Sequence, residues 1–364
     1  MMVVLQHAMP ALASAGLRSG LAPFEPGSIA VLLFFVLSGF IVTDAAALFY
    51  ERRAPEFLLN RMIRIYPPYA VAVALTVLVT SAVQALGGNE AITALFGTAP
   101  DHSVHNILAS LAGILPVAGK GLEPAGSEPI LILAWALRIE LVFYGVVFLA
   151  LAAGRLIDQP AARLLAVAGI LVLGFDALRF EHLRGSGLEF TPYFVLGASI
   201  YFAITPASRR RRVLAAALVL ISSVMIGVHI LGQAPVNEVA GFVRDLSGQC
   251  ELFYTGIAVW LALMVMPRTV PSRIQALDQM LGELTYPLYL THMTALLPCV
   301  WLVPRGSAMA WPLALAATLA MAWAMHRLLE TRLMAVRRRV RGHALTVQRA
   351  GPVPMTQRPN QTAA

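Results

Sequence analysis

The sequence predicts an all-α fold, a polytopic transmembrane helix bundle of about ten helices with both termini cytoplasmic. Of its 364 residues, 58% are hydrophobic and only 13% are charged, whereas a soluble domain carries roughly 25% charged residues. The chain repeats apolar runs of a length that crosses a bilayer as a helix, which takes about 20 residues. Its basic residues gather in alternate connections between these runs.

The apolar runs define ten expected spans. Most have the length that a span needs, although 191–205 lies near the lower limit of about 17 residues. The stretch 105–118 is also apolar, but about 14 residues suit an interfacial or re-entrant segment better than a span. In chain order, we place the spans at 1–17, 28–49, 66–86, 130–152, 162–179, 191–205, 213–231, 251–267, 285–303 and 311–329.

The Arg and Lys residues test the number and direction of these spans. One set of connections, counted with Arg163 and Arg327 at adjoining helix ends, holds 20 of the 27 basic residues. Basic residues mark the cytoplasmic face of a membrane protein, so an even number of spans places both termini inside. We expect residues 1–332 to form one membrane domain and residues 333–364 to form a basic, then disordered cytoplasmic tail. The basic connections are 51–65, 153–161, 206–212 and 268–284, together with the tail from 330.

The net charge of +8 therefore reflects membrane topology and does not predict nucleic-acid binding. Basic runs such as Arg209–Arg212 and Arg337–Arg339 lie at helix ends, where they are suited to contact anionic lipid. The two cysteines, Cys250 and Cys299, have neither metal-binding nor redox spacing. We therefore predict no metal site.

Three titratable residues are expected near the middle of the bilayer. At about 1.5 Å per residue, His7, Glu140 and His292 each come out roughly 15 Å from either surface. Groups of this kind at membrane depth are functional candidates, and one cavity could hold all three. The alternative is structural, since either histidine could simply hydrogen-bond between helices. Glu140, with Arg138 as a second possible lining residue, is harder to assign to a purely structural role.

The segment 51–69 is unusual because it combines arginines with a Tyr-Pro-Pro-Tyr run at the membrane entry. Arg61 and Arg64 are three residues apart and so share a helix face. Two guanidinium forks on one face suit phosphate recognition. Anchoring by positive charge at the cytoplasmic face, followed by an aromatic belt, explains these residues equally well.

These residues belong to six motifs that follow one another in the order of a known family. They are 34-FFVLSGFIVT-43, R-x-x-R-I-Y-P at 61–67, W-x-L-x-x-E-x-x-F-Y at 135–144, F-x-x-G at 194–197, T-Y-P-L-Y-L-T-H at 285–292 and Glu330 after the last span. Together they resemble the acyltransferase family 3, which includes bacterial O-acetyltransferases of exopolysaccharide, lipopolysaccharide O-antigen and Nod factor. The resemblance covers residues 1 to about 332.

The resemblance implies an enzyme of the cytoplasmic (inner) membrane that transfers an acyl group, most often acetyl, from cytoplasmic acyl-coenzyme A to a sugar hydroxyl. Acyl-coenzyme A is then a donor substrate, and no bound cofactor is expected. His7 would act as general base, and Glu140 would orient it or stabilise its imidazolium. A covalent acyl-histidine relay is the rival mechanism. The donor phosphates would be held by Arg61, Arg64, Arg52 and Arg53, and the cavity would be lined by Arg138, His292, Tyr286, Trp135 and Ser38.

The sequence departs from the family pattern at its start. The family carries a basic residue eleven positions before the essential histidine, which would fall four residues before Met1. Only nine residues precede Pro10, so we expect the first helix to be N-terminally incomplete. Smaller departures are Ala136 and Thr331-Arg332, and neither implies loss of function.

A different class of protein would also place charges in the middle of the membrane. A transporter or flippase of lipid-linked saccharides uses such residues to bind its cargo. The R-x-x-R-I-Y-P and W-x-L-x-x-E-x-x-F-Y motifs occurring together favour the acyltransferase, because a transporter has no reason to pair them. A non-enzymatic scaffold is disfavoured by the three midplane groups.

Overall fold

The structure, a computed structural model, is helical throughout the residues it describes, and these contain no strand. The described residues are 2–12, 25–51, 53–115, 130–153, 188–205, 208–232, 246–265, 272–304, 307 and 309–342. The elements are α1 (Met2–Leu12), α3 (Pro26–Phe49), α4 (Ala54–Ala85), α5 (Asn89–Phe96), α6 (Val104–Gly113), α7 (Ala134–Ala153), the 3-10 turn η4 (Leu188–Phe190), α9 (Thr191–Ile204), α10 (Arg209–Leu231), α11 (Leu246–Val265), α12 (Ser272–Leu302), α13 (Ala310–Met325), the π-helical turn η5 (His326–Glu330) and α14 (Thr331–Arg341). The prediction of an all-α fold is confirmed for this part of the chain.

Within the described residues, five helical segments are long and apolar enough to cross a membrane: α3, α4, α7, α10 and the continuous segment Ala310–Arg341. The predicted span at 191–205 coincides with α9, and those at 251–267 and 285–303 overlap α11 and the C-terminal half of α12. The predicted span 162–179 lies outside the described residues. Several apolar helices of membrane-spanning length therefore agree with a multi-pass membrane protein, whereas the total of ten spans stays a prediction.

Three helices extend well beyond the spans expected from hydropathy. The connection 51–65 is continuous with the following span, because α4 runs unbroken through Pro67 and Pro68. The two prolines each remove one amide donor from the helix, but they do not end it. Likewise α12 begins thirteen residues before the expected span, at Ser272, and α13 continues through η5 into α14. Hydropathy locates only the apolar part of a helix, so polar ends of this kind are missed.

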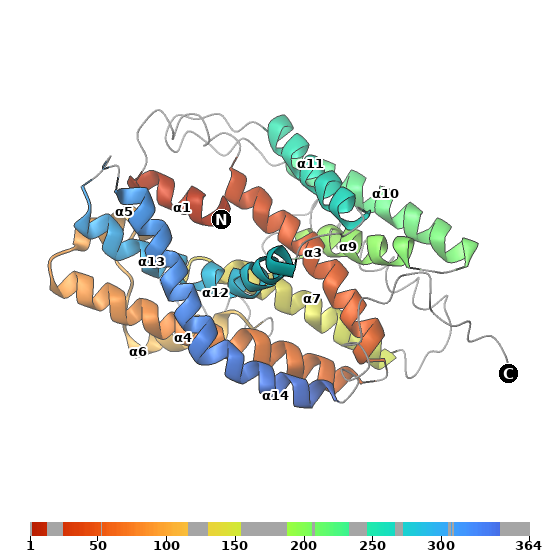
Figure 1. Cartoon of the computed structure of the whole chain (residues 1–364), viewed down its shortest axis with the longest axis horizontal. Helices are drawn as coiled ribbons and strands as arrows, with labels where there is room; N and C mark the ends of the chain where they lie inside the picture. Colours follow the sequence, from red (N-terminus) through yellow and green to blue (C-terminus); the bar gives the residue numbers. More distant parts are fainter. Residues whose placement is uncertain are drawn as a thin grey trace.

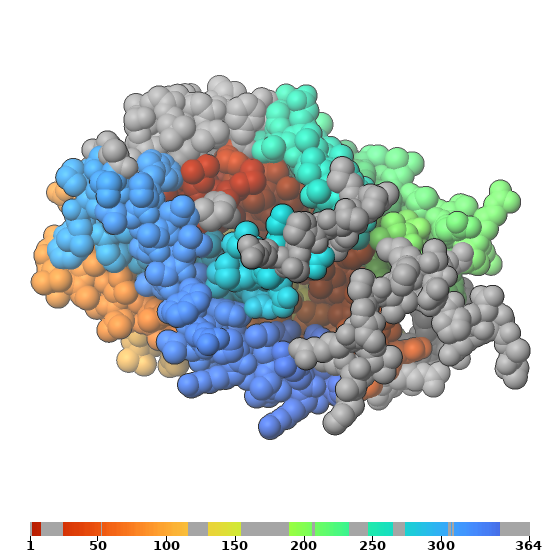
Figure 2. Space-filling model, in the orientation of Figure 1, coloured from red at the N-terminus to blue at the C-terminus, as the bar shows by residue number. Residues whose placement is uncertain are grey.

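The helices pack in a fixed order around α12 (Figure 1). On one side α12 contacts α13, α4 and α1; on the other, α3 packs on α9, which packs on α10. The helix α14 lies along the first turns of α4 (Figure 1). The space-filling view shows the same C-terminal helices, in blue, on the outer surface of the molecule (Figure 2). Residues from the start, middle and end of the chain thus meet at one end of the bundle.

The contact between α3 and α9 depends on two glycines. A Cβ added to Gly39 would lie 2.2 Å from the carbonyl oxygen of Phe194, and one added to Gly197 would lie 1.9 Å from that of Val36. Small residues let membrane helices approach until their backbones touch. The close approach explains the glycines of two of the six motifs, and it fixes Ser38, the neighbour of Gly39, beside α7.

Substitution of these glycines tests the packing. We expect Gly39→Ala and Gly197→Ala to destabilise the protein by at least about 1–3 kcal/mol, because an added methyl group forces the two backbones apart. Gly145 of α7 is the matched control, since nothing lies within 4 Å of a Cβ added there. Gly145→Ala should leave the unfolding temperature in detergent unchanged or raise it slightly. Equal unfolding temperatures for all three variants would contradict this packing.

Candidate active site

The helix α4 carries an arginine pair into the interior of the bundle. Arg61 is only 3% exposed, and its guanidinium carbon lies 5.4 Å from the ring centroids of both Phe57 and Tyr144. Its buried Nε has no hydrogen-bond partner. Arg64, one turn further along α4, interacts electrostatically with Tyr144 and Glu140. The pair therefore presents positive charge, and one free donor, to the inside of the protein.

Glu140 of α7 faces this arginine pair. It is 3% exposed and accepts a hydrogen bond of 3.3 Å from the Ser38 hydroxyl of α3. A second hydrogen bond comes from the Tyr144 hydroxyl, one turn further along α7. An apolar interior tolerates an ionised carboxylate only where charge and hydrogen bonds compensate it. Ser38, Tyr144 and the arginine pair supply that compensation.

Residues of the helix α12 and the turn η5 also lie next to this group of charged residues. The Tyr286 hydroxyl donates a hydrogen bond of 2.9 Å to the carbonyl of Ile65, which places Tyr286 beside Arg64. Glu330 of η5 also interacts electrostatically with Arg64 and lies 3.1 Å from the imidazole Nδ1 of His326. Residues from α3, α4, α7, α12 and η5 thus surround one polar group inside the bundle.

A pair of histidines forms a second group. The rings of His7 in α1 and His292 in α12 have centroids 5.4 Å apart. The His292 side chain is fully buried, and its Nδ1 lies 2.9 Å from the Tyr289 carbonyl and 3.2 Å from that of Leu288. A carbonyl can only accept, so Nδ1 of the neutral ring carries the proton and Nε2 carries a lone pair. That Nε2 has no hydrogen-bond partner.

The two groups lie at different levels along the helix axes. The Tyr289 hydroxyl donates a hydrogen bond of 2.9 Å to the Leu133 carbonyl, so these residues share a level. Glu140 follows Leu133 by seven residues in one direction and His292 follows Tyr289 by three in the other, which corresponds to a separation of about 15 Å along the axes. Within the described residues, no hydrogen bond joins His7 to Glu140. The structure therefore brings His7 and His292 together and places Glu140 with the arginines.

This arrangement differs from the expected single cavity at one depth. Counting residues from the ends of an apolar run assumes straight helices of equal tilt. The helix α7 begins only at Ala134, after a non-helical turn, so counting residues before this helix does not measure distance along its axis. Glu140 and His292 are buried and His7 is partly buried, and the three groups do not share one level.

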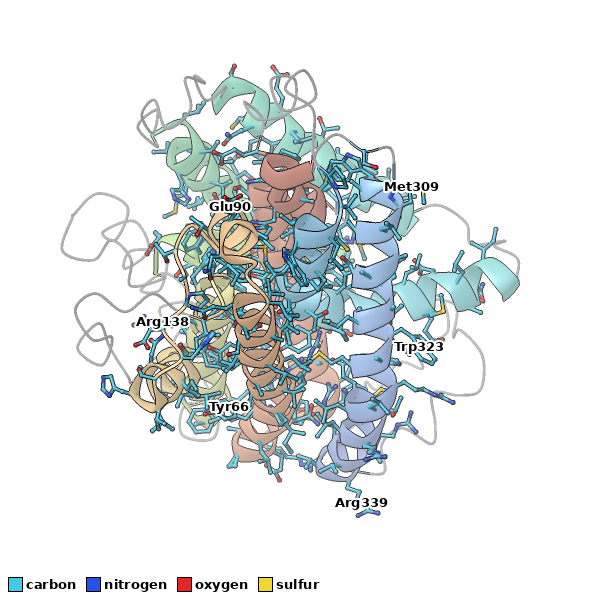
Figure 3. The ribbon with its side chains drawn as sticks, turned by 90° about the vertical axis from the view of Figure 1, so that its left-hand side faces the viewer. Tyr66, Glu90, Arg138, Met309, Trp323 and Arg339 are labelled. Atoms are coloured by element: carbon cyan, nitrogen blue, oxygen red, sulfur yellow. The ribbon has the colours of Figure 1, made fainter. Side chains whose placement is uncertain are left out.

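Two of the expected cavity residues lie elsewhere. Trp135 is 44% exposed, and its ring centroid lies 6.2 Å from that of Phe35 and 5.8 Å from that of Phe190. It belongs to an aromatic cluster between α3, α7 and η4. Arg138 is half-buried and lies at the edge of the bundle in Figure 3. Neither is placed at the arginine pair or at the histidines.

Arg53, another arginine of the expected phosphate site, differs from the pair on α4. Arg53 donates hydrogen bonds of 2.9 Å and 3.1 Å to the carbonyls of Arg341 and Val340 and forms an ion pair with Glu56. A cation at this position caps the free carbonyls at the end of α14. Arg52 lies outside the described residues. Arg61 and Arg64 thus remain as the central pair.

Comparison with known proteins identifies the family of this chain and one relative. A family model described as an acyltransferase domain matches residues 1–327. The exopolysaccharide production protein ExoZ of Rhizobium meliloti (strain 1021) is 28% identical over 289 residues, which covers 75% of this chain and 78% of that protein. No solved structure matches.

The balance of buried charge can be tested by stability measurements. We expect Glu140→Gln to lower the free energy of unfolding by about 1–3 kcal/mol, because it removes the charged acceptor that compensates the arginine pair. Adding Arg64→Gln should restore part of the loss, since it removes the excess positive charge. Thermal unfolding of the purified variants in detergent measures both effects. A double variant less stable than Glu140→Gln would contradict charge compensation between these residues.

Proposed function

Since this chain belongs to the acyltransferase family whose model covers residues 1–327, we propose that it is a membrane-embedded O-acyltransferase using cytoplasmic acyl-coenzyme A. It transfers the acyl group, which we take to be acetyl, to a hydroxyl of a sugar or polysaccharide precursor. The observation that carries the proposal is the presence of two groups in one bundle. A buried arginine pair suits the donor phosphates, and a buried histidine with a free ring nitrogen suits a general base.

The donor would bind through its phosphates at Arg61 and Arg64. Guanidinium groups bind phosphate through two parallel hydrogen bonds, and the buried Nε of Arg61 has a donor to offer. The pantetheine arm would then run along the bundle past Glu140 and Tyr144 towards the histidines. That arm, fully extended, is of the right order to cover the separation of the two groups.

The chemistry would take place at His7 and His292. The lone pair on one of these rings accepts the proton of the acceptor hydroxyl while its oxygen attacks the thioester carbonyl. The carbon–sulfur bond breaks, and the coenzyme A thiolate takes up a proton as it leaves. A positioned base of this kind contributes about 10²–10⁴-fold to the rate. We propose direct transfer, with a covalent acyl-histidine intermediate as the alternative.

Glu140 has a different role in this proposal. Its hydrogen bonds go to Ser38 and Tyr144, and its electrostatic partners include the arginine pair. It therefore compensates the charges of the donor site and lies beside the path of the pantetheine arm. The earlier hypothesis that Glu140 orients His7 is replaced by this role.

The acceptor class is supported by the relative, whose name refers to exopolysaccharide production. We propose that a sugar hydroxyl, free or lipid-linked, reaches the histidines from the end of the bundle opposite the arginines. This requires the arginine end to face the cytoplasm, as the distribution of basic residues predicts. The protein would lie in the inner membrane with ten spans and both termini inside.

Acyl transfer by the purified protein tests the function. With acetyl-coenzyme A and a polysaccharide precursor, we expect His7→Ala and His292→Ala each to reduce turnover about 10²-fold or more. The double variant should be hardly worse than the worse single one, because residues that act as a unit are non-additive. His105 of α6 is exposed, so His105→Ala is the matched control. Near-normal turnover in both single variants would place the base elsewhere.

The role of the arginine pair is tested separately. Arg61→Ala and Arg64→Ala should raise the KM for acetyl-coenzyme A by about tenfold or more, because each loses charge-assisted hydrogen bonds to phosphate. Arg210→Ala and Arg211→Ala change exposed arginines of α10 and should leave the KM unchanged. If the α4 variants bind the donor as tightly as wild type, the pair serves only to orient the protein in the membrane.

A further inference from the structure

The helix α14 is fastened to the start of α4 at two levels. The Asn60 side chain is buried. Its amide nitrogen donates a hydrogen bond of 2.9 Å to the Arg337 carbonyl, and its amide oxygen accepts one of 3.3 Å from the Arg337 Nε. One to two turns further out, Arg53 donates to the carbonyls of Val340 and Arg341. These contacts join residues 277 to 288 positions apart in the sequence. They hold α14 in a defined register against α4.

The arginines of α14 divide between two faces of the helix. Arg337 and Arg341 are one turn apart and only partly exposed, whereas Arg332, Arg338 and Arg339 are exposed. Figure 3 shows Arg339 projecting away from the bundle at the end of the helix. The exposed arginines suit the lipid headgroups expected from the sequence. The inward pair faces the protein instead.

The inward pair adds to the positive charge of the α4 arginines. Arg337 interacts electrostatically with Arg64, Arg61 and Arg341. The guanidinium carbon of Arg341 lies 4.8 Å from the Phe49 ring centroid, and its buried Nε has no hydrogen-bond partner. Arg61 likewise has a buried Nε without a partner. Four neighbouring guanidinium groups with two unused buried donors are unfavourable unless an anion compensates them.

Among the described residues, the carboxylates near these arginines do not match this charge. Glu140 and Glu330 both interact with the arginines, but Glu140 also accepts two hydrogen bonds from hydroxyl groups and Glu330 lies against His326. The site therefore suits a ligand that carries several negative charges. A molecule with one phosphate cluster near α4 and another near α14 fits it best.

We propose that Arg337 and Arg341 bind the 3′-phosphate of the acyl-coenzyme A donor, while Arg61 and Arg64 bind its pyrophosphate. This inference rests on the proposed function. The pyrophosphate is attached directly to the pantetheine arm, so it must lie at the deeper pair, and the ribose with its 3′-phosphate must lie further out. Arg337 meets α4 at Asn60, one turn, or about 6 Å, outward from Arg64. The outer pair is thus placed where the 3′-phosphate has to be.

Binding of coenzyme A and of 3′-dephospho-coenzyme A, which lacks only the 3′-phosphate, tests the proposal. Calorimetry uses the full chain in nanodiscs of neutral phosphatidylcholine, so that no lipid phosphate with net charge competes. Wild type should bind coenzyme A about tenfold or more tightly than the dephospho form. In the double variant Arg337→Gln/Arg341→Gln, the ratio of the two affinities, for coenzyme A and for the dephospho form, should fall close to one. The charge-matched control Arg338→Gln/Arg339→Gln should keep the wild-type ratio.

The outcomes separate this inference from the proposed function. If wild type binds neither compound, the use of acyl-coenzyme A and the role of α14 both fall. If wild type binds both equally, or if the inward variant keeps the wild-type ratio, only the role of α14 falls. The same holds if the inward variant differs from wild type only in nanodiscs with anionic lipid. Should the double variant fail to fold, Arg341→Gln alone, which leaves the contacts of Asn60 intact, must still lower the ratio.

Discussion

The arrangement of the bundle depends on placing two arginines inside an apolar protein. Arg61 and Arg64 lie on a helix that is otherwise apolar enough to span a membrane, where an isolated charge is costly. Their positions require a carboxylate nearby and hydroxyl groups that hold it. Glu140, Ser38 and Tyr144 meet that requirement from two other helices. The relative positions of α3, α4 and α7 are therefore constrained by electrostatics as well as by packing.

The same constraint separates the charged group from the histidines. A lone pair on Nε2 of His292 serves as a base only if the ring stays neutral, and its Nδ1 is already bonded to carbonyl groups of its own helix. Direct contact with a carboxylate would favour the protonated ring instead. Tyr289, which is bonded to the Leu133 carbonyl, lies between the two groups. The proposed binding of phosphate would thus use the positively charged group, and the proposed transfer of a proton would use the neutral histidines, within one bundle.

Sequence reasoning could single out individual residues as candidates but not all of their partners. Charges and imidazoles inside apolar runs stand out because burial makes them costly, so Arg61, Glu140 and His292 were found from composition alone. Their grouping depends on helix tilt, on where each helix begins and on contacts between distant segments. None of these has a local signal, and the cap that Arg53 forms on α14 shows this most clearly. Its carbonyl partners lie 287 and 288 residues away.

The arginines of α14 can both orient the protein in the membrane and form the proposed phosphate-binding site. The positive-inside rule depends only on the number of basic residues, so every arginine of α14 contributes to it regardless of where its side chain points. A helix repeats every 3.6 residues, so charges 337 and 341 can face the protein while 338 and 339 face outward. Orientation in the membrane needs only the total, whereas binding of a phosphate needs the particular face. The partial burial of Arg337 and Arg341, two of the five arginines of α14, is therefore the observation that orientation in the membrane leaves unexplained.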